Sequence, residues 1–417
     1  MMHRRHFQTV AVLAASGLAT CSPGFASFVG DDDQLEDSVR GLLLGGLIGD
    51  ALGGPIEFRE PDGEQTGLCD AREWPDSQKI NSLRLSDLAH EIPLKSYAAL
   101  RPDTAAYGPW RVRAKAGTLT DDSRHKIVLL RAIAATCKSK VALDEKILAQ
   151  AFLDFVPKPQ SDTPNLDALV EEGLREYRYA ARWILGERNP KLARPLARLW
   201  AGVNNCSGQM LLPPLAAGFA GDPDAAYRKA FELDFVDASQ AKDFTGALVA
   251  GLSSVLTPDA RGSSVDDRWQ LVLKTMRDTD PFGYRDVPFA GRRLDKWLDK
   301  SQELAGRANK SPKKLYELLE SEGKPVFWWD AHFTLLVPLT ILHFCEFNSM
   351  AAMHLTLDFG HDTDSYAQVL GCLAGAVEGS NIFPANMQEA AQSTLAEDYG
   401  ESLDAWIDLL QQREWKT

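Results

Sequence analysis

The sequence lacks the features that mark several large classes of protein. It has only six cysteines in 417 residues, and no two of them have C-x-x-C spacing, so a cysteine-based zinc site is not expected. Its formal net charge is -13, and it has no long basic run, which disfavours nonspecific binding to nucleic-acid phosphates. No low-complexity linker or internal repeat is visible. What remains is a globular chain with 45% hydrophobic residues, enough for a sizeable core.

Strand-like alternation is also scarce, and apolar residues recur mainly at helical spacing. The predicted helices cover residues 34–52, 123–137, 143–155, 165–185, 192–201, 223–235, 244–256, 266–277, 293–308, 327–347, 366–379 and 401–412. Residues 59–117 interrupt them as a long insertion that either packs over the core or shapes a substrate pocket. We therefore expect an all-α fold, with one compact multi-helix domain over residues 31–417.

The first thirty residues have the pattern of an export signal. A basic start with Arg4 and Arg5 precedes an apolar run at 9–20 that is too short to span a membrane comfortably. The small-residue segment 23–26 is a plausible cleavage site, and the R-R-x-F start fits the twin-arginine route as well as an ordinary secretory one. A lipoprotein box at Cys21 is less favoured. We expect a periplasmic or extracellular protein, with no stable membrane insertion after signal removal.

Two acidic clusters, about 240 residues apart, each stand where a helix should begin. One runs from Thr120 to Ser123, and the other contains Asp362, Asp364 and Ser365. Carboxylates and hydroxyls are the ligands that Mg²⁺ prefers, and the backbone at a helix start lets consecutive acids face one ion. Each cluster alone is equally explained as an ordinary helix cap with acidic residues in the first turn. Together they look like two halves of one metal site.

A third segment near the start of the chain is rich in glycine. It runs from Gly45 to Phe58 and contains four further glycines and Asp50 inside an otherwise apolar stretch. Glycines within a helical run usually mark close helix packing, and a buried aspartate needs a polar partner. Pro55 should end the helix and place Glu57 in a loop.

The three segments, in this order, resemble the ADP-ribosylglycohydrolase family, which includes hydrolases of ADP-ribosyl-arginine and ADP-ribosyl-serine. The family pattern G-x-x-x-G-D-A-x-G-x-x-x-E corresponds here to residues 45–57. The T-D-D-T/S motif corresponds to residues 120–123, and G-G-D-T-D-T/S to residues 360–365. The resemblance implies an all-helical fold with two Mg²⁺ ions, for which Mn²⁺ can substitute.

The resemblance also implies roles for individual residues. The implied metal ligands are Thr120, Asp121, Asp122, Asp362, Asp364 and Ser365. Glu57 would lie at the metal and substrate, and Glu57 and Asp121 are the candidate catalytic carboxylates. Ser207, Gly208 and His361 are the remaining candidate substrate contacts. The implied reaction is Mg²⁺-dependent cleavage of the C1″ glycosidic bond of an ADP-ribosylated protein or small ribosyl compound, which releases ADP-ribose.

Three positions depart from the family pattern. His361 stands where the family often has glycine. Leu211 stands where members active on ADP-ribose often have arginine. Around Asp237, the Thr-His pair of the family is replaced by other residues. His361 has either a backbone-fixing role or a direct role in substrate binding or proton transfer. The changes at Leu211 and Asp237 keep two alternatives open. One is a binuclear-metal N- or O-glycosidase for another ribosyl or nucleoside-type compound, and the other is a non-catalytic ligand-binding relative.

Overall fold

The computed structural model describes residues 32–57, 105–107, 112–114, 117–156, 166–195, 204–288, 291–412 and 415–416. The predicted export signal at 1–30 lies outside the described residues, and so does most of the predicted insertion at 59–117. The elements of the N-terminal half are α1 (Asp32–Gly53), η1 (Gly54–Ile56), β1 (Ala105–Tyr107), β2 (Val112–Ala114), α5 (Asp121–Ser139), α6 (Glu145–Asp154), α7 (Leu166–Ile184), α8 (Ser207–Leu211) and α9 (Leu215–Gly218).

The C-terminal half continues almost entirely as helices. They are α10 (Pro223–Leu233), α11 (Gln240–Val255), α12 (Pro258–Arg261), α13 (Val265–Asp278), η4 (Tyr284–Asp286), α14 (Arg293–Ala308), α15 (Pro312–Glu322), α16 (Ala331–Phe344), α17 (Ser349–Phe359), α18 (Thr363–Glu378), η5 (Ser380–Ile382), α19 (Ala385–Thr394), the π-helical turn η6 (Leu395–Tyr399) and α20 (Leu403–Gln411). The all-α prediction is confirmed.

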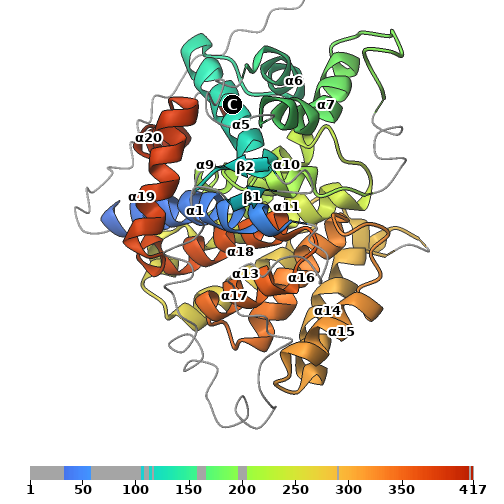
Figure 1. Ribbon diagram of the computed structural model, residues 1–417, viewed down its shortest axis with the longest axis vertical. Helices are drawn as coiled ribbons and strands as arrows, with labels where there is room; N and C mark the ends of the chain where they lie inside the picture. The colour runs from blue at the N-terminus through green and yellow to red at the C-terminus, as the bar shows by residue number, and fades with distance from the viewer. Residues whose placement is uncertain are drawn as a thin grey trace, which may run out of the picture.

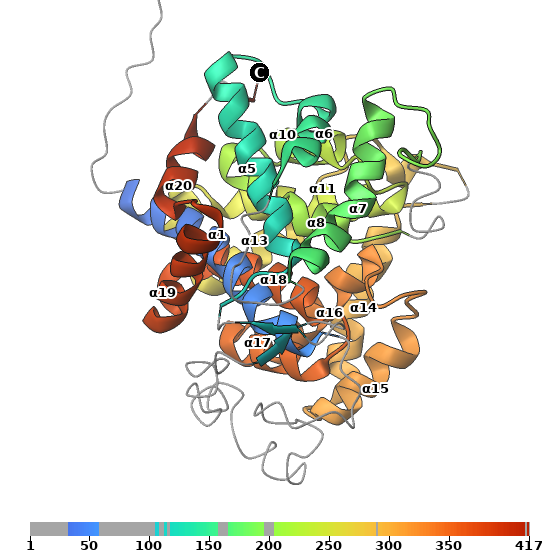
Figure 2. The same cartoon turned by 45° about the horizontal axis from the view of Figure 1, so that its top comes forward.

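The central feature of the fold is the pairing of α1 with α18, which lie side by side in the middle of both views (Figures 1 and 2). Glycines make this close approach possible. A Cβ atom at Gly45 would lie only 1.9 Å from the Gly371 carbonyl oxygen, and one at Gly375 only 1.9 Å from the Gly41 carbonyl oxygen. Any larger side chain would force the helices apart. This contact, here called the glycine seam, is made by Gly41 and Gly45 of α1 with Gly371 and Gly375 of α18. It joins the first and last thirds of the chain.

Other helices surround this central pair. Helices α5, α6 and α7 occupy the upper part of Figure 1, α14 and α15 the lower right, and α19 and α20 the left. Helix α11 packs against α10 and α13, and α16 lies against both α14 and α18. One continuous hydrophobic core links these layers, and α1, α5, α11, α16 and α18 all contribute buried residues to it. The start of α5 is thereby brought to the end of α1.

Most predicted helices are present with small shifts at their ends. The prediction of 293–308 matches α14, and 34–52 lies within α1. The predicted helix at 192–201 is wrong over its described part, because residues 192–195 are turn and coil. Helix α16 begins at Ala331 rather than at 327, since the Asp330 carboxylate accepts a hydrogen bond from the Val326 amide in a turn. Among the described residues, the one sheet is the antiparallel β1–β2 hairpin.

One described segment is long and apolar enough to cross a membrane by length and composition. It is Leu35–Ile56, and 89% of its apolar window is buried inside the protein. A core helix of a globular protein passes the same test. The role of α1 as one half of the glycine seam accounts for its composition.

Candidate metal centre

Asp50 is held at the start of α5. The Thr120 hydroxyl donates a hydrogen bond to Asp50 Oδ1 at 2.5 Å, and the backbone amides of Thr120 and Ser123 donate to the same carboxylate. An aspartate that accepts bonds from the free amides of a helix N-terminus caps that helix from another element. Asp50 therefore fixes α5 to α1. Thr120 and Ser123 are the polar partners that a buried aspartate requires.

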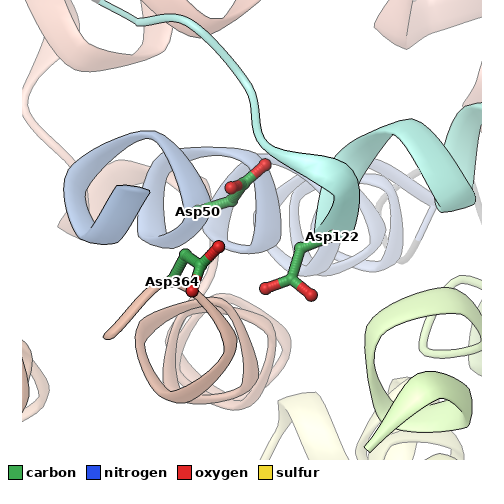
Figure 3. A group of neighbouring side chains, drawn as sticks. All are labelled: Asp50, Asp122 and Asp364. Atoms are coloured by element: carbon green, nitrogen blue, oxygen red, sulfur yellow. The ribbon is translucent and has the colours of Figure 1, made fainter. Parts of the chain in front are cut away.

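Three carboxylates converge from three helices. Asp50 comes from α1, Asp122 from the first turn of α5 and Asp364 from the first turn of α18, and Figure 3 shows their side chains turned toward a common space. One ligand atom from each lies within 4.8 Å of the others. All three side chains are buried. We call this group position 1.

A second group shares one of these residues. Glu57, Asp362 and Asp364 also offer ligand atoms that lie within 4.8 Å of one another. Glu57 directly follows η1, and Asp362 directly precedes α18, so the ends of two elements deliver these acids. We call this group position 2. Asp364 belongs to both positions, which are therefore adjacent.

The carboxylates of the two positions repel one another. Burial raises the pKa of Asp122 well above its usual value, and the charge of Asp364 raises it further. Burial and then the charges of Asp364 and Asp121 do the same to the pKa of Glu57. Burial raises the pKa of Asp362 to about 7. Several like charges in one buried space are costly unless protons or cations neutralise them.

The donors fit a hard divalent cation. Both carboxylate oxygens of Asp122 and Oδ2 of Asp362 are buried, yet they accept no hydrogen bond from any described residue. Buried polar atoms normally have a partner, so such oxygens point to a ligand. Oxygen donors without nitrogen or sulfur are typical of Mg²⁺, Mn²⁺ and Ca²⁺ sites. The clustered acids therefore have the chemistry of a centre that would hold two divalent ions, and Asp364 belongs to both groups of carboxylates.

The structure places three of the six predicted metal ligands, Asp122, Asp362 and Asp364, in the two clusters. Thr120 caps α5 and its hydroxyl accepts a hydrogen bond from the Asp122 amide. The Asp121 side chain lies against α7, where a Cβ at Gly173 would be 2.9 Å from its own Cβ. Asp121 is outside both clusters, although its charge raises the pKa of Glu57. The third carboxylate of position 1, beside those of Asp122 and Asp364, is that of Asp50.

The predicted substrate loop reaches the start of α18. Cys206 Sγ lies 3.8 Å from Ser365 Oγ, which places the loop beside a predicted metal ligand. The Ser207 hydroxyl accepts a hydrogen bond from the Asn205 side chain at 2.8 Å. The Gly208 amide donates to Asp237 Oδ2 at 2.8 Å, and Leu211 is buried. The loop is thus anchored by Asp237 on one side and borders the acidic centre on the other.

The His361 side chain has an aromatic partner and a carboxylate partner, both outside the two clusters. Its ring stacks on Trp328 with centroids 3.6 Å apart, and its Nε2 lies 3.1 Å from the Glu320 carboxylate. Its backbone has a φ of 63°, in the left-handed region that favours glycine. The histidine therefore replaces a glycine at some conformational cost that the stacking offsets. This geometry favours the backbone-fixing role for His361.

Asp234 and Asp237 form a second buried acidic pair beyond the loop. The Asp237 amide donates to Asp234 Oδ1 at 3.3 Å. Burial raises the pKa of Asp234 to about 6, and burial together with the Asp234 charge raises the pKa of Asp237 well above its usual value. Burial and mutual repulsion therefore both oppose full ionisation of this pair of carboxyls.

Replacing Asp234 by asparagine should stabilise the protein at neutral pH. A carboxyl whose pKa is raised on folding binds its proton more tightly in the folded protein, so stability falls as pH rises from about 4, the unfolded pKa, towards the folded value. Asparagine does not titrate and keeps the oxygen that accepts the Asp237 amide. Urea unfolding should show the advantage of Asp234→Asn growing between pH 4 and 7, to on the order of 2 kcal/mol. The exposed Asp259→Asn should show no such trend, and a pH-independent difference for Asp234→Asn would contradict the expectation.

Sequence reasoning overlooked two residues of the centre. Asp50 was visible only as an aspartate in an apolar run, and nothing in its own segment indicates which carboxylates it faces. Lys126 follows the acid pair by one turn of α5 and is buried, with 2% of its surface exposed. A lysine at helical spacing from Asp122 within an apolar helix was the available signal.

Similarity to known proteins extends over nearly the whole chain. The ADP-ribosylglycohydrolase family profile matches residues 31–416. A solved structure described as an "ADP-ribosylglycohydrolase-related protein complex" superposes with a TM-score of 0.54 and 18% sequence identity, and the match covers 91% of this chain and 98% of the other. No curated protein sequence matches. The structural similarity supports the fold, and the profile match spans nearly the whole chain.

Proposed function

Because the chain belongs to the ADP-ribosylglycohydrolase family, and is therefore a glycosidase-type hydrolase of ADP-ribosyl type, we propose that it cleaves the C1″ bond of an ADP-ribosylated substrate. The reaction would require two Mg²⁺ ions, with Mn²⁺ as a substitute, and would release ADP-ribose. The substrate would be an ADP-ribosylated protein or a small ribosyl compound. We propose that the protein acts in the periplasm or outside the cell after export.

One observation carries the proposal: five carboxylates converge, and buried oxygens of two of them, Asp122 and Asp362, accept no hydrogen bond from the described residues. The five are Asp50, Glu57, Asp122, Asp362 and Asp364. Burying like charges costs stability, and a purely structural scaffold gains nothing from it. Functional sites are where such costs are usually retained. This argues against a non-catalytic relative.

The chain's own residues suit glycosidic cleavage. Position 1 would hold one ion through Asp50, Asp122 and Asp364, and position 2 the other through Glu57, Asp362 and Asp364. Bound ions of this kind orient sugar hydroxyls and increase the acidity of a water molecule. Glu57, which directly follows η1 and borders position 2, would accept the proton of the attacking water as general base. Asp121, beside this group, is the other candidate base. The bond at the anomeric carbon breaks through an oxocarbenium-like state.

A second candidate function rests on the loop from Asn204 to Leu211. The buried, uncharged Leu211 offers no cation to a diphosphate, and Asp237 places an acidic group behind Gly208. Both features favour a less anionic ligand. The alternative is therefore a binuclear-metal N- or O-glycosidase that acts on another ribosyl or nucleoside-type compound.

A hydrolysis screen separates these functions. Purified protein with Mg²⁺ should release ADP-ribose from ADP-ribosyl-arginine, ADP-ribosyl-serine or O-acetyl-ADP-ribose, measured by chromatography, and chelation should stop the reaction. Glu57→Gln should lower the rate by about 10²–10⁴, whereas the exposed Glu389→Gln in α19 should not. Turnover of simple nucleosides alone would favour the alternative, and turnover unaffected by chelation would contradict the metal requirement.

A further inference from the structure

We propose that Lys126 is a built-in cation that makes the two ion positions unequal, so that position 1 binds a divalent ion more weakly than position 2. The inference rests on the two-ion centre of the proposed function and not on its substrate. It concerns a residue of this chain outside the two ligand clusters.

Lys126 is packed between three helices, α5, α1 and α18. It lies one turn after Asp122 on α5, and its Nζ donates a hydrogen bond to the Asp122 carbonyl oxygen at 3.1 Å. A Cβ at Gly46 of α1 would meet Lys126 Cε at 3.5 Å, and would also lie 2.7 Å from Cys372 Sγ of α18. The side chain has no room to swing out to solvent. The lysine charge is therefore held within the core, behind position 1.

Lys126 lies beside the helix segments that carry Asp50 and Asp122, two of the carboxylates of position 1. It lowers the pKa values of Asp50 and Asp122, opposing the effect of burial on both. Glu57 comes after η1, beyond the end of α1, and Asp362 comes before the start of α18, whereas Lys126 contacts Asp122 directly and lies beside Gly46, one turn before Asp50. A cation that stabilises ionised ligands in the absence of metal also repels a metal ion that arrives there.

The neighbouring basic residue, Arg124, also interacts with the charge of Asp50, but its side chain is held by other partners. Arg124 donates through Nη2 to the Leu119 carbonyl oxygen at 2.7 Å and through Nε to the Tyr399 hydroxyl at 3.2 Å. Its guanidinium thus supports the loop before α5. The lysine ammonium, by contrast, has three N–H groups and, among the described residues, donates one hydrogen bond, to a carbonyl oxygen. Position 2 should consequently fill first, and position 1 should fill only at higher ion concentration.

The test is a Mn²⁺ titration of the metal-free protein, with free Mn²⁺ followed by electron paramagnetic resonance and heats by calorimetry. Wild-type protein should bind two ions with unequal dissociation constants. Lys126→Met should tighten the weaker one by about tenfold or more and leave the tighter one nearly unchanged. Lys126→Arg, which keeps the charge, should preserve the inequality. If Lys126→Met does not yield folded protein by circular dichroism, Lys126→Gln removes the same charge.

The control is Lys242→Met, which removes a partly buried lysine whose charge acts on Asp234 and Asp237 instead. It should leave both dissociation constants unchanged. Equal constants in the wild type, or an unchanged ratio of the two in both Lys126→Met and Lys126→Gln, would overturn the inference and leave the proposed function standing. A wild-type protein that binds no divalent ion would contradict the metal requirement of the proposed function itself.

Discussion

Asp364→Asn should abolish divalent-ion binding at both positions and lower hydrolysis by about 10³ or more. Asp364 is shared by the two clusters, so one substitution removes a charged ligand from each. The asparagine side chain keeps the size and one oxygen, including the acceptor for the Ser365 amide at 3.0 Å. Calorimetry with Mg²⁺ would measure the loss of binding, and ADP-ribose release the loss of turnover.

The same variant should be more stable than the wild type when both lack metal. Burial and then the charges of Asp362 and Asp121 raise the pKa of Asp364, which shows how unfavourable its ionised form is there. Removing one of several mutually repelling charges relieves that cost. In the wild type, saturating Mg²⁺ should raise the urea midpoint, and in Asp364→Asn it should not. The exposed Asp408→Asn in α20 should behave as the wild type does, and a destabilised metal-free Asp364→Asn would point to a structural role.

The location of the site follows from short local patterns. Thr120 to Ser123 and Asp362 to Ser365 each combine a helix start with acids, and a helix start positions acids in the same way in any fold. The sequence therefore indicated which segments meet. It could not indicate that the carboxylate of Asp50 lies close to those of Asp122 and Asp364, because that proximity depends on how α5 is rotated against α1. The Thr120–Asp50 hydrogen bond sets this rotation.

Helices were predicted well where one face is apolar and the ends carry clear signals. The match for α14 reflects its regular apolar positions, Leu294, Leu298, Leu304 and Ala305, which are all buried. Residues 327–330 open a strongly apolar run, which predicts a helix over 327–347, and three of these four residues are aromatic. The structure instead uses them in a turn, in which Phe327 stacks on Trp329. Aromatic content marks burial or stacking and does not distinguish a helix from a turn that packs against one.

Gly45→Ala should destabilise the protein by about 3 kcal/mol and weaken metal binding as well. The added Cβ would lie 1.9 Å from the Gly371 carbonyl oxygen and 2.5 Å from its carbonyl carbon, and backbone atoms cannot rotate away as a side chain can. The two helices must separate. Because α1 carries Asp50 and leads to Glu57, whereas α18 carries Asp364, separation also widens the spacing between carboxylates in both positions.

The matched control for Gly45→Ala is Gly306→Ala, within α14. A Cβ at Gly306 would have nothing within 4 Å, so alanine there should be neutral or stabilising by up to about 1 kcal/mol. Both variants make the same chemical change inside a helix, and the difference between them isolates helix contact from helix propensity. Urea unfolding without metal measures the stability of each, and Mn²⁺ titration the affinity. If Gly45→Ala loses stability yet keeps wild-type affinity, the α1–α18 seam supports the fold without controlling the spacing of the ligands.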